Sequence, residues 1–180
     1  MMEYCPNCGA KDTVRRVKTK LDFNFKNEII TVDAEIYECS NCREQFDDAF
    51  ESEKYVQEAR RIYFEKHHLL KPEELKQFLD EYDLSYRDVE AITGIAFKTI
   101  SRYVYGVIPD RSNSTLLKIL KNYKNVFLDL VEENKQKLST RKYKKLVNRL
   151  KTEIQKETNN DSKLNRAGEA KVNYGRQEKN

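Results

Sequence analysis

Residues 84–106, LSYRDVEAITGIAFKTISRYVYG, contain two short helical segments around a glycine. Ser85 is a typical N-cap for the first segment, and Gly94 separates it from the second. At helical spacing, the inward residues are Val89, Ile92, Ile100 and Tyr103. Two helices of this length around a glycine turn predict a helix-turn-helix.

The second helix of this pair presents Lys98, Thr99 and Arg102 at positions i, i+1 and i+4. Such a polar face suits the major groove of DNA, where an arginine can bind guanine O6 and N7 through two hydrogen bonds. The alternative is an ordinary helical hairpin within a bundle. We favour DNA binding because three polar side chains share the exposed face.

Further helices are expected on both sides of this motif, giving an all-α domain over residues 71–135. Pro72 suits the first turn of a helix. Ser112 or Ser114 is expected to cap a later helix, and Asn125 the next one. The apolar residues of these three helices are Leu75, Phe78, Leu79, Leu116, Leu117, Ile119, Leu120, Phe127, Leu128, Leu130 and Val131.

The net charge of +4 conceals a strongly basic C-terminal extension, because residues 135–180 hold 14 Lys/Arg and only 5 Asp/Glu. Residues 136–157 predict a basic amphipathic helix with Tyr143, Leu146, Val147, Leu150 and Ile154 on one side. This helix either adds phosphate contacts or packs its apolar stripe on a dimer or partner. Residues 158–180 have almost no apolar anchor and are predicted to be disordered.

The N-terminal part, residues 1–50, predicts a small β domain. Leu21, Phe23 and Phe25 alternate with polar residues, and Ile30, Val32, Ala34 and Ile36 do the same after the polar stretch 26–28. Period-two alternation around a polar break is typical of a hairpin with one buried face. Residues 51–70 then switch to helical spacing and predict a connecting helix, so the fold class is α+β.

Four cysteines form two pairs, Cys5/Cys8 and Cys39/Cys42, which the hairpin would bring together. Two Cys-x-x-Cys pairs are a strong signal for tetrahedral Zn²⁺, one ion per chain. Iron, a dithiol redox site and disulfides are the alternatives, but a redox motif needs only one pair in a βαβ setting and cytoplasmic proteins rarely hold disulfides. Four sulfur ligands leave no open position, so the metal is expected to be structural. Arg43 stands where the first pair has Gly9, and we expect the second turn to be less tight.

Catalysis and membrane insertion are both disfavoured. His67 and His68 are adjacent and fit partly exposed helix-end residues better than ligands or catalytic groups. No nucleophile–base pair or phosphate-binding glycine loop is recognisable, so we expect no enzyme activity. The longest apolar runs are far shorter than a membrane span, and no secretory signal follows Met1. We therefore expect a cytoplasmic protein.

The helix-turn-helix residues Ser85, Ile100–Tyr103 and Gly106, followed by Pro109 and Ser114–Lys118, resemble the Xre/Cro-like motif of bacterial and phage repressors. With the two cysteine pairs before them, residues 3 to about 130 resemble the MqsA (YgiT-type zinc finger) antitoxin family. The resemblance implies a zinc-ribbon domain that holds a small toxin, and a C-terminal helical domain that dimerises and binds a palindrome in its own promoter.

The same resemblance places the family's base-reading residues on Lys98 and Arg102. Arg102 matches, whereas Lys98 replaces an asparagine, which implies a different preferred base. Neighbouring Phe97 is expected to touch a thymine methyl, and Tyr86 to contact the DNA backbone or support the reading helix. The remaining predicted phosphate contacts are Ser85, Arg87, Lys98 and Ser101, with Thr99 on the same face.

The resemblance thus implies an antitoxin of a type II toxin–antitoxin system, which binds double-stranded operator DNA as an autorepressor and neutralises a neighbouring toxin. The alternative is a stand-alone, zinc-containing phage or mobile-element transcriptional regulator without a toxin. A third hypothesis makes the zinc module the functional part and the helices an assembly scaffold.

Overall fold

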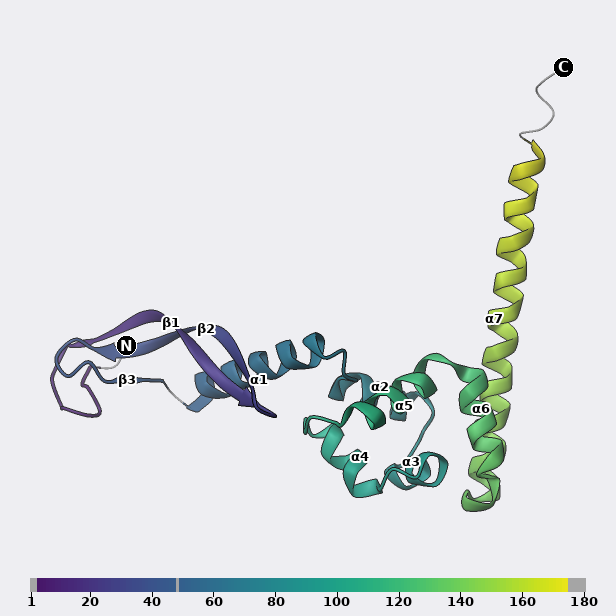
Figure 1. Ribbon diagram of the computed structural model, residues 1–180, viewed down its shortest axis with the longest axis horizontal. Helices are drawn as coiled ribbons and strands as arrows, with labels where there is room; N and C mark the ends of the chain where they lie inside the picture. Colours follow the sequence, from purple (N-terminus) through teal and green to yellow (C-terminus); the bar gives the residue numbers. More distant parts are fainter. Residues whose placement is uncertain (1–2, 48, 175–180) are drawn as a thin grey trace. The chain divides into compact units, whose positions relative to one another are not determined.

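The computed structural model describes residues 3–47 and 49–174, which form two compact units that divide between Leu69 and Leu70 (Figure 1). The first unit combines an antiparallel sheet with one helix. In the second unit, every regular element among the described residues is a helix. The predicted α+β class is confirmed.

A long hairpin builds the first unit. Its strands, β1 (Val14–Phe25) and β2 (Glu28–Cys39), meet at a two-residue turn in which Lys26 and Asn27 have φ of 50° and 68°. Positive φ at both turn residues matches the twist of antiparallel strands. The register pairs Leu21 with Val32 and Phe23 with Ile30, which places the predicted apolar residues on one face. A short strand, β3 (Gln45–Phe46), pairs with β2.

Helix α1 (Ala49–Lys66) belongs to this first unit and contacts both long strands. The Tyr55 hydroxyl donates to the Glu35 carbonyl and accepts from the Glu35 N–H, both at 2.9 Å. The buried apolar residues are Ile30, Val32, Ala34 and Ile36 on β2 and Tyr55, Ala59, Tyr63 and Phe64 on α1. The structure therefore differs from the prediction of a connecting helix over residues 51–70, because the apolar stripe of α1 is buried against the hairpin.

The second unit begins with five helices: α2 (Pro72–Glu81), α3 (Tyr86–Thr93), α4 (Phe97–Val104), α5 (Arg111–Asn122) and α6 (Lys124–Glu133). Ser85 caps α3 by accepting from the Asp88 N–H, and Gly94 ends it with a φ of 76°. Helices α3 and α4 thus lie on either side of the glycine turn, as predicted. Pro72 occupies the first position of α2, also as predicted.

Two predicted helix caps are wrong. Asp110, and neither Ser112 nor Ser114, caps α5, because its side chain accepts from the Asn113 N–H. Ser114 is buried instead, and its hydroxyl accepts a 2.7 Å hydrogen bond from the Leu70 N–H. Helix α6 starts at Lys124 after Tyr123, without a side-chain cap from Asn125.

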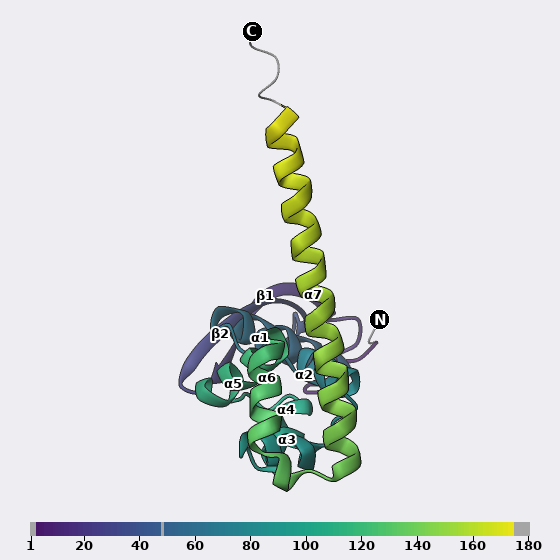
Figure 2. The same ribbon diagram turned by 90° about the vertical axis from the view of Figure 1, so that its right-hand side faces the viewer.

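The basic extension is an integral part of the second unit. After a short 3₁₀ helix (Lys135–Lys137), helix α7 (Thr140–Tyr174) runs alongside α6 and continues past it (Figure 2). Leu146, Val147 and Leu150 lie in the same core cluster as Phe78 and Phe127. Four of the five residues of the predicted apolar stripe, all except Ile154, therefore pack within their own chain.

Helix α7 also continues farther than predicted, to Tyr174, where disorder was expected from residue 158. Extending a helix costs much less than nucleating one, so a helix anchored by packing over its first half can continue through residues without apolar anchors. Residues 175–180 of the predicted tail lie outside the described residues.

Candidate metal centre and nucleic-acid interface

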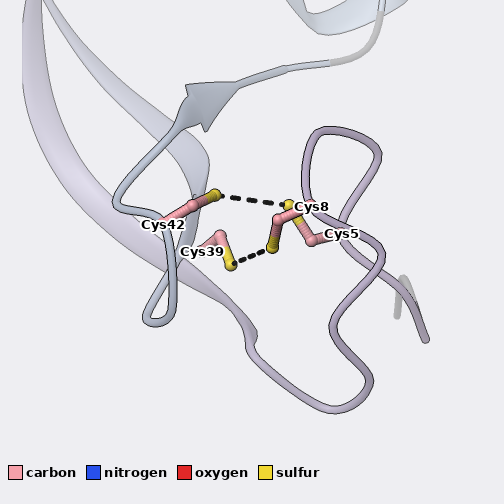
Figure 3. A group of neighbouring side chains, drawn as sticks. All are labelled: Cys5, Cys8, Cys39 and Cys42. Atoms are coloured by element: carbon pink, nitrogen blue, oxygen red, sulfur yellow. Dashed lines mark hydrogen bonds between the residues drawn. The ribbon is translucent and has the colours of Figure 1, made fainter.

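The four cysteines converge at the end of the hairpin that lies opposite its turn (Figure 3). Cys39 is the last residue of β2, and the other three lie on the adjoining loops. The Sγ atoms of Cys5 and Cys42 are 3.7 Å apart, and those of Cys8 and Cys39 are 3.8 Å apart. All four sulfurs lie within 4.8 Å of one another, close enough to hold one metal ion.

The two cysteine turns have matching backbone geometry. In the first turn, the Gly9 N–H donates to the Cys5 carbonyl at 2.9 Å. In the second, the Arg43 N–H donates to the Cys39 carbonyl at 2.8 Å. Gly9 and Arg43 both adopt left-handed backbone, with φ of 71° and 59°. The expectation of a looser second turn is therefore wrong, because Arg43 accepts a conformation that glycine adopts more readily.

Hydrogen bonds favour the thiolate form of Cys8 and Cys39. The Thr13 hydroxyl, 3.2 Å from Cys39 Sγ, together with backbone N–H groups, lowers the pKa of Cys39 to about 6. The Asn41 amide donates to Cys8 Sγ at 3.5 Å and lowers the pKa of Cys8. At Cys42 the backbone N–H of Glu44 acts in the same direction, but burial and the hydrogen bond with Cys8 prevail and raise the pKa to about 11. Such second-sphere donors suit sulfur ligands, which bind metals as thiolates.

The surface of α4 carries the predicted DNA-reading side chains. Ile100 and Tyr103 are buried, whereas Lys98 and Arg102 are exposed on the opposite side of the helix. Tyr103 fixes α4 to the start of α5, because its hydroxyl donates to Asp110 Oδ2 at 2.9 Å and accepts from the Asn113 amide at 3.0 Å. Within the part of the chain that the structure describes, the side chains of Lys98 and Arg102 have no hydrogen-bond or ion-pair partner. Their charges are available to an external anion.

The other predicted DNA contacts differ in their availability. Arg87 is exposed and its guanidinium lies 5.3 Å from the ring centroid of half-buried Phe97. The Ser85 hydroxyl is already engaged with Asp88, which leaves it less free to bind a phosphate. Tyr86, Thr99 and Ser101 are partly exposed.

Sequence reasoning missed three surface features close to this helix pair. Tyr105 directly follows α4 and is 80% exposed, the highest value among the large hydrophobic residues described. Tyr105 does not continue the helical spacing of the buried residues Ile100 and Tyr103, and this could have indicated its exposure. The others are Lys142 and Lys145, which pair with Asp83 just before α3. Residues 59 and 62 positions apart in the chain give no local sequence signal of their contact.

His67 lies at the end of α1, away from the cysteines, and its Nε2 is 2.6 Å from Glu28 Oε2. No helix in the described part of the chain is long and apolar enough to span a membrane.

The model of one protein family, described as the antitoxin component of a bacterial toxin-antitoxin system, MqsA, matches residues 2–135. This match includes all four cysteines and helices α1 to α6, and it ends before α7. A search of curated proteins found no match.

Proposed function

Because the chain belongs to the MqsA antitoxin family, we propose that it is the antitoxin of a type II toxin–antitoxin pair. In this proposal it acts in the cytoplasm, neutralises a toxin encoded beside it by protein–protein binding, and represses its own operon. It performs no catalysis of its own. The observation that carries the proposal is the family match, which covers well over half of the chain.

We propose that the four cysteines hold one structural Zn²⁺. Two observations support this: the sulfurs lie within 4.8 Å of one another, and hydrogen bonds lower the pKa of Cys8 and Cys39. Four thiolates are one of the usual tetrahedral ligand sets of structural zinc, and such a site has no open position for a substrate. The metal would therefore supply stability to the first unit, which would present the surface for the toxin.

We propose that α4 enters the major groove of a double-stranded operator, with a homodimer of the second unit reading two half-sites. Support comes from the exposed, unpaired charges of Lys98 and Arg102 and from the anchoring of the buried side of α4. In this arrangement Arg102 reads a guanine and Lys98 a neighbouring base or phosphate, with Phe97 against a thymine methyl. Arg87, Tyr86, Ser85, Thr99 and Ser101 contribute phosphate contacts or support.

The antitoxin role is tested by expressing the gene adjacent to this one, with and without this protein. We expect growth arrest that co-expression relieves, together with a complex that survives co-purification. Absence of both toxicity and a complex would contradict the antitoxin role and favour the stand-alone regulator.

The DNA-reading role is tested with Arg102→Ala. Loss of a bidentate guanine contact should cost about 1 to 3 kcal/mol of discrimination between the upstream DNA and a random duplex. Fluorescence anisotropy measures both affinities, and circular dichroism checks the fold. Lys76→Ala, an exposed lysine on α2, is the matched control and should leave discrimination unchanged. Equal discrimination by Arg102→Ala and the control would remove Arg102 from the reading helix.

A further inference from the structure

Helix α7 is fixed relative to α3 although it lies beyond the part of the chain that matches the family model. Leu146 and Leu150 of α7 are almost completely buried in the core that also contains Val89 and Ile92 of α3. Interiors are close-packed, so side chains on the first turns of α7 are held beside the same elements. The first turns of α7 are therefore held in place on the surface around α3.

The start of α3 is where a helix-turn-helix meets the DNA backbone. The first helix of such a motif crosses the backbone, and helix N-termini bind phosphates through their free N–H groups. Here, however, Asp83 and Asp88 place two carboxylates at this end of α3. The side chain of Asp83 is 64% exposed. Unopposed, these carboxylates would repel the phosphates that the N-terminus attracts.

Helix α7 supplies the opposing charges. Lys145 Nζ lies 2.8 Å from Asp83 Oδ2. Lys142 Nζ lies 3.5 Å from the same oxygen and 3.4 Å from Asp88 Oδ2, and it also donates to the Asp83 carbonyl. Two lysines of α7 therefore face two carboxylates, and Arg87 on the first turn of α3 adds a third cation to this region. Lys142, Lys145, Arg87, Asp83 and Asp88 sum to one positive charge, and without the two lysines of α7 the remaining three sum to one negative charge.

The two lysines differ in how strongly the protein holds them. Lys142 is the more enclosed, with 20% of its side chain exposed, and it fixes the start of α3. Lys145 is 63% exposed and its partner Asp83 is equally open. An ion pair in solvent contributes little stability, so Lys145 can exchange Asp83 for a phosphate at low cost.

We propose that Lys142 and Lys145 of α7 form, together with Arg87, an auxiliary phosphate-binding surface of the DNA-binding unit. This inference rests on the proposed operator binding and adds a binding element from outside the matched part of the chain. Lys142 neutralises the carboxylates at the start of α3, and Lys145 contacts a backbone phosphate. The surface contributes affinity and salt dependence and does not select a base sequence.

The test measures binding of the full chain to a duplex from the DNA directly upstream of its gene, by fluorescence anisotropy over a range of salt concentrations. For Lys142→Gln/Lys145→Gln we expect affinity to fall about tenfold or more, and the slope of log K against log salt to become shallower by roughly 1 to 2. Asp83→Asn should have the opposite effect, tightening binding a few-fold because Lys145 no longer has a competing carboxylate.

The matched control is Lys151→Gln/Lys156→Gln, which removes two cations farther along the same helix. Lys151 faces Glu132 of α6 at 3.5 Å, and Lys156 is exposed. We expect a salt slope close to that of the unmodified chain. If the double variant at 142 and 145 melts at a lower temperature, Lys145→Gln alone keeps the test valid, because its pair is open to solvent.

The outcomes separate this inference from the proposal on which it rests. If the unmodified chain does not prefer its upstream DNA over a random duplex, operator binding fails. If it does, but Lys145→Gln matches the control and Asp83→Asn does not tighten binding, the phosphate surface is overturned and operator binding stands. A loss of discrimination as large as the loss of affinity would also overturn it, because removing a phosphate contact weakens binding to all sequences alike.

Discussion

At the scale of single residues, Ser114 shows how one buried hydroxyl joins two segments of the second unit. It is 1% exposed, and its Oγ accepts from the Leu70 N–H at 2.7 Å. Leu70 lies directly before α2, so this bond fixes the entry of the chain into the unit. Burial makes the bond important, because an N–H left without an acceptor cannot turn to water.

Ser114→Ala should therefore lower the free energy of unfolding of the second unit by about 1 to 3 kcal/mol. The measurement is chemical denaturation followed by circular dichroism. Ser112→Ala is the matched control, since Ser112 is exposed on the same helix. A loss of stability as small as that of the control would mean that the Leu70 N–H finds another acceptor.

The same residues show why a sequence cannot always identify a cap. Asp110, Ser112 and Ser114 are all suitable capping residues close to the start of α5. Which of the three residues caps α5 depends on which backbone N–H each side chain reaches and on which side of α5 is buried. Arg43 is a similar case, because only the fold requires its left-handed backbone, whereas Gly9 could be predicted from its permissive backbone.

At the scale of elements, α7 completes the core of the second unit. Leu146, Val147 and Leu150 have exposures of 2%, 7% and 0%. Burial of each such side chain contributes roughly 1.5 to 3 kcal/mol, so their sum is comparable to the whole stability of a small domain. Helix α7 is thus a structural requirement as well as a source of charge.

Truncation after Asn134 should abolish cooperative thermal unfolding of the second unit, because the partners of these three residues become exposed. Truncation after Glu157 should leave the melting temperature unchanged, since the three core residues and the contact between Lys124 and Glu157 remain. Differential scanning calorimetry measures the melting transition of both truncated chains. Cooperative melting of the shorter chain would show that α2 to α6 form a sufficient core.

Glu153 connects α7 to α2 and gives the second unit a pH dependence. Burial opposes its ionisation, but hydrogen bonds from the Tyr82 hydroxyl at 2.7 Å and from Arg149 at 3.0 Å outweigh burial and lower the pKa of the carboxyl. A carboxyl with a lowered folded-state pKa stabilises the fold above its ordinary pKa. This stability is lost as the pH falls through the folded-state pKa.

Glu153→Gln should accordingly destabilise the second unit near neutral pH and flatten its loss of stability below about pH 4.5. Melting temperatures measured across the acid range test this. Glu132→Gln is the control, because Glu132 forms an exposed pair with Lys151. Parallel pH profiles for Glu153→Gln and the unmodified chain would contradict the assigned role.

Elements with strong local signals were predictable. The alternation of Leu21 and Phe23 with Ile30 and Val32 indicated the hairpin, and Ser85 and Gly94 indicated the ends of α3. The stripe of α7 was also visible, but the surface it covers was not. Its partners include residues of α2, which is distant in sequence, and an amphipathic helix looks the same whether its partner lies in its own chain or in another.

At the scale of the whole molecule, the division between Leu69 and Leu70 predicts two units that respond differently to metal loss. All four cysteines belong to the first unit, whose buried apolar residues are few. Small domains often require a metal for stability. Structural zinc contributes on the order of 10 kcal/mol or more, which exceeds the stability expected of a unit of this size.

Cys39→Ser should therefore abolish zinc binding and unfold the first unit, while the second unit remains folded. Zinc content by atomic absorption and amide hydrogen exchange, resolved along the chain, measure both effects: we expect fast exchange over the hairpin and α1 and unchanged protection of α2 to α6. Ser40→Ala, at an exposed neighbour, is the control. Persistent protection of the hairpin would mean that its core with α1 suffices without metal, whereas loss of protection in α2 to α6 would mean that the two units do not fold independently.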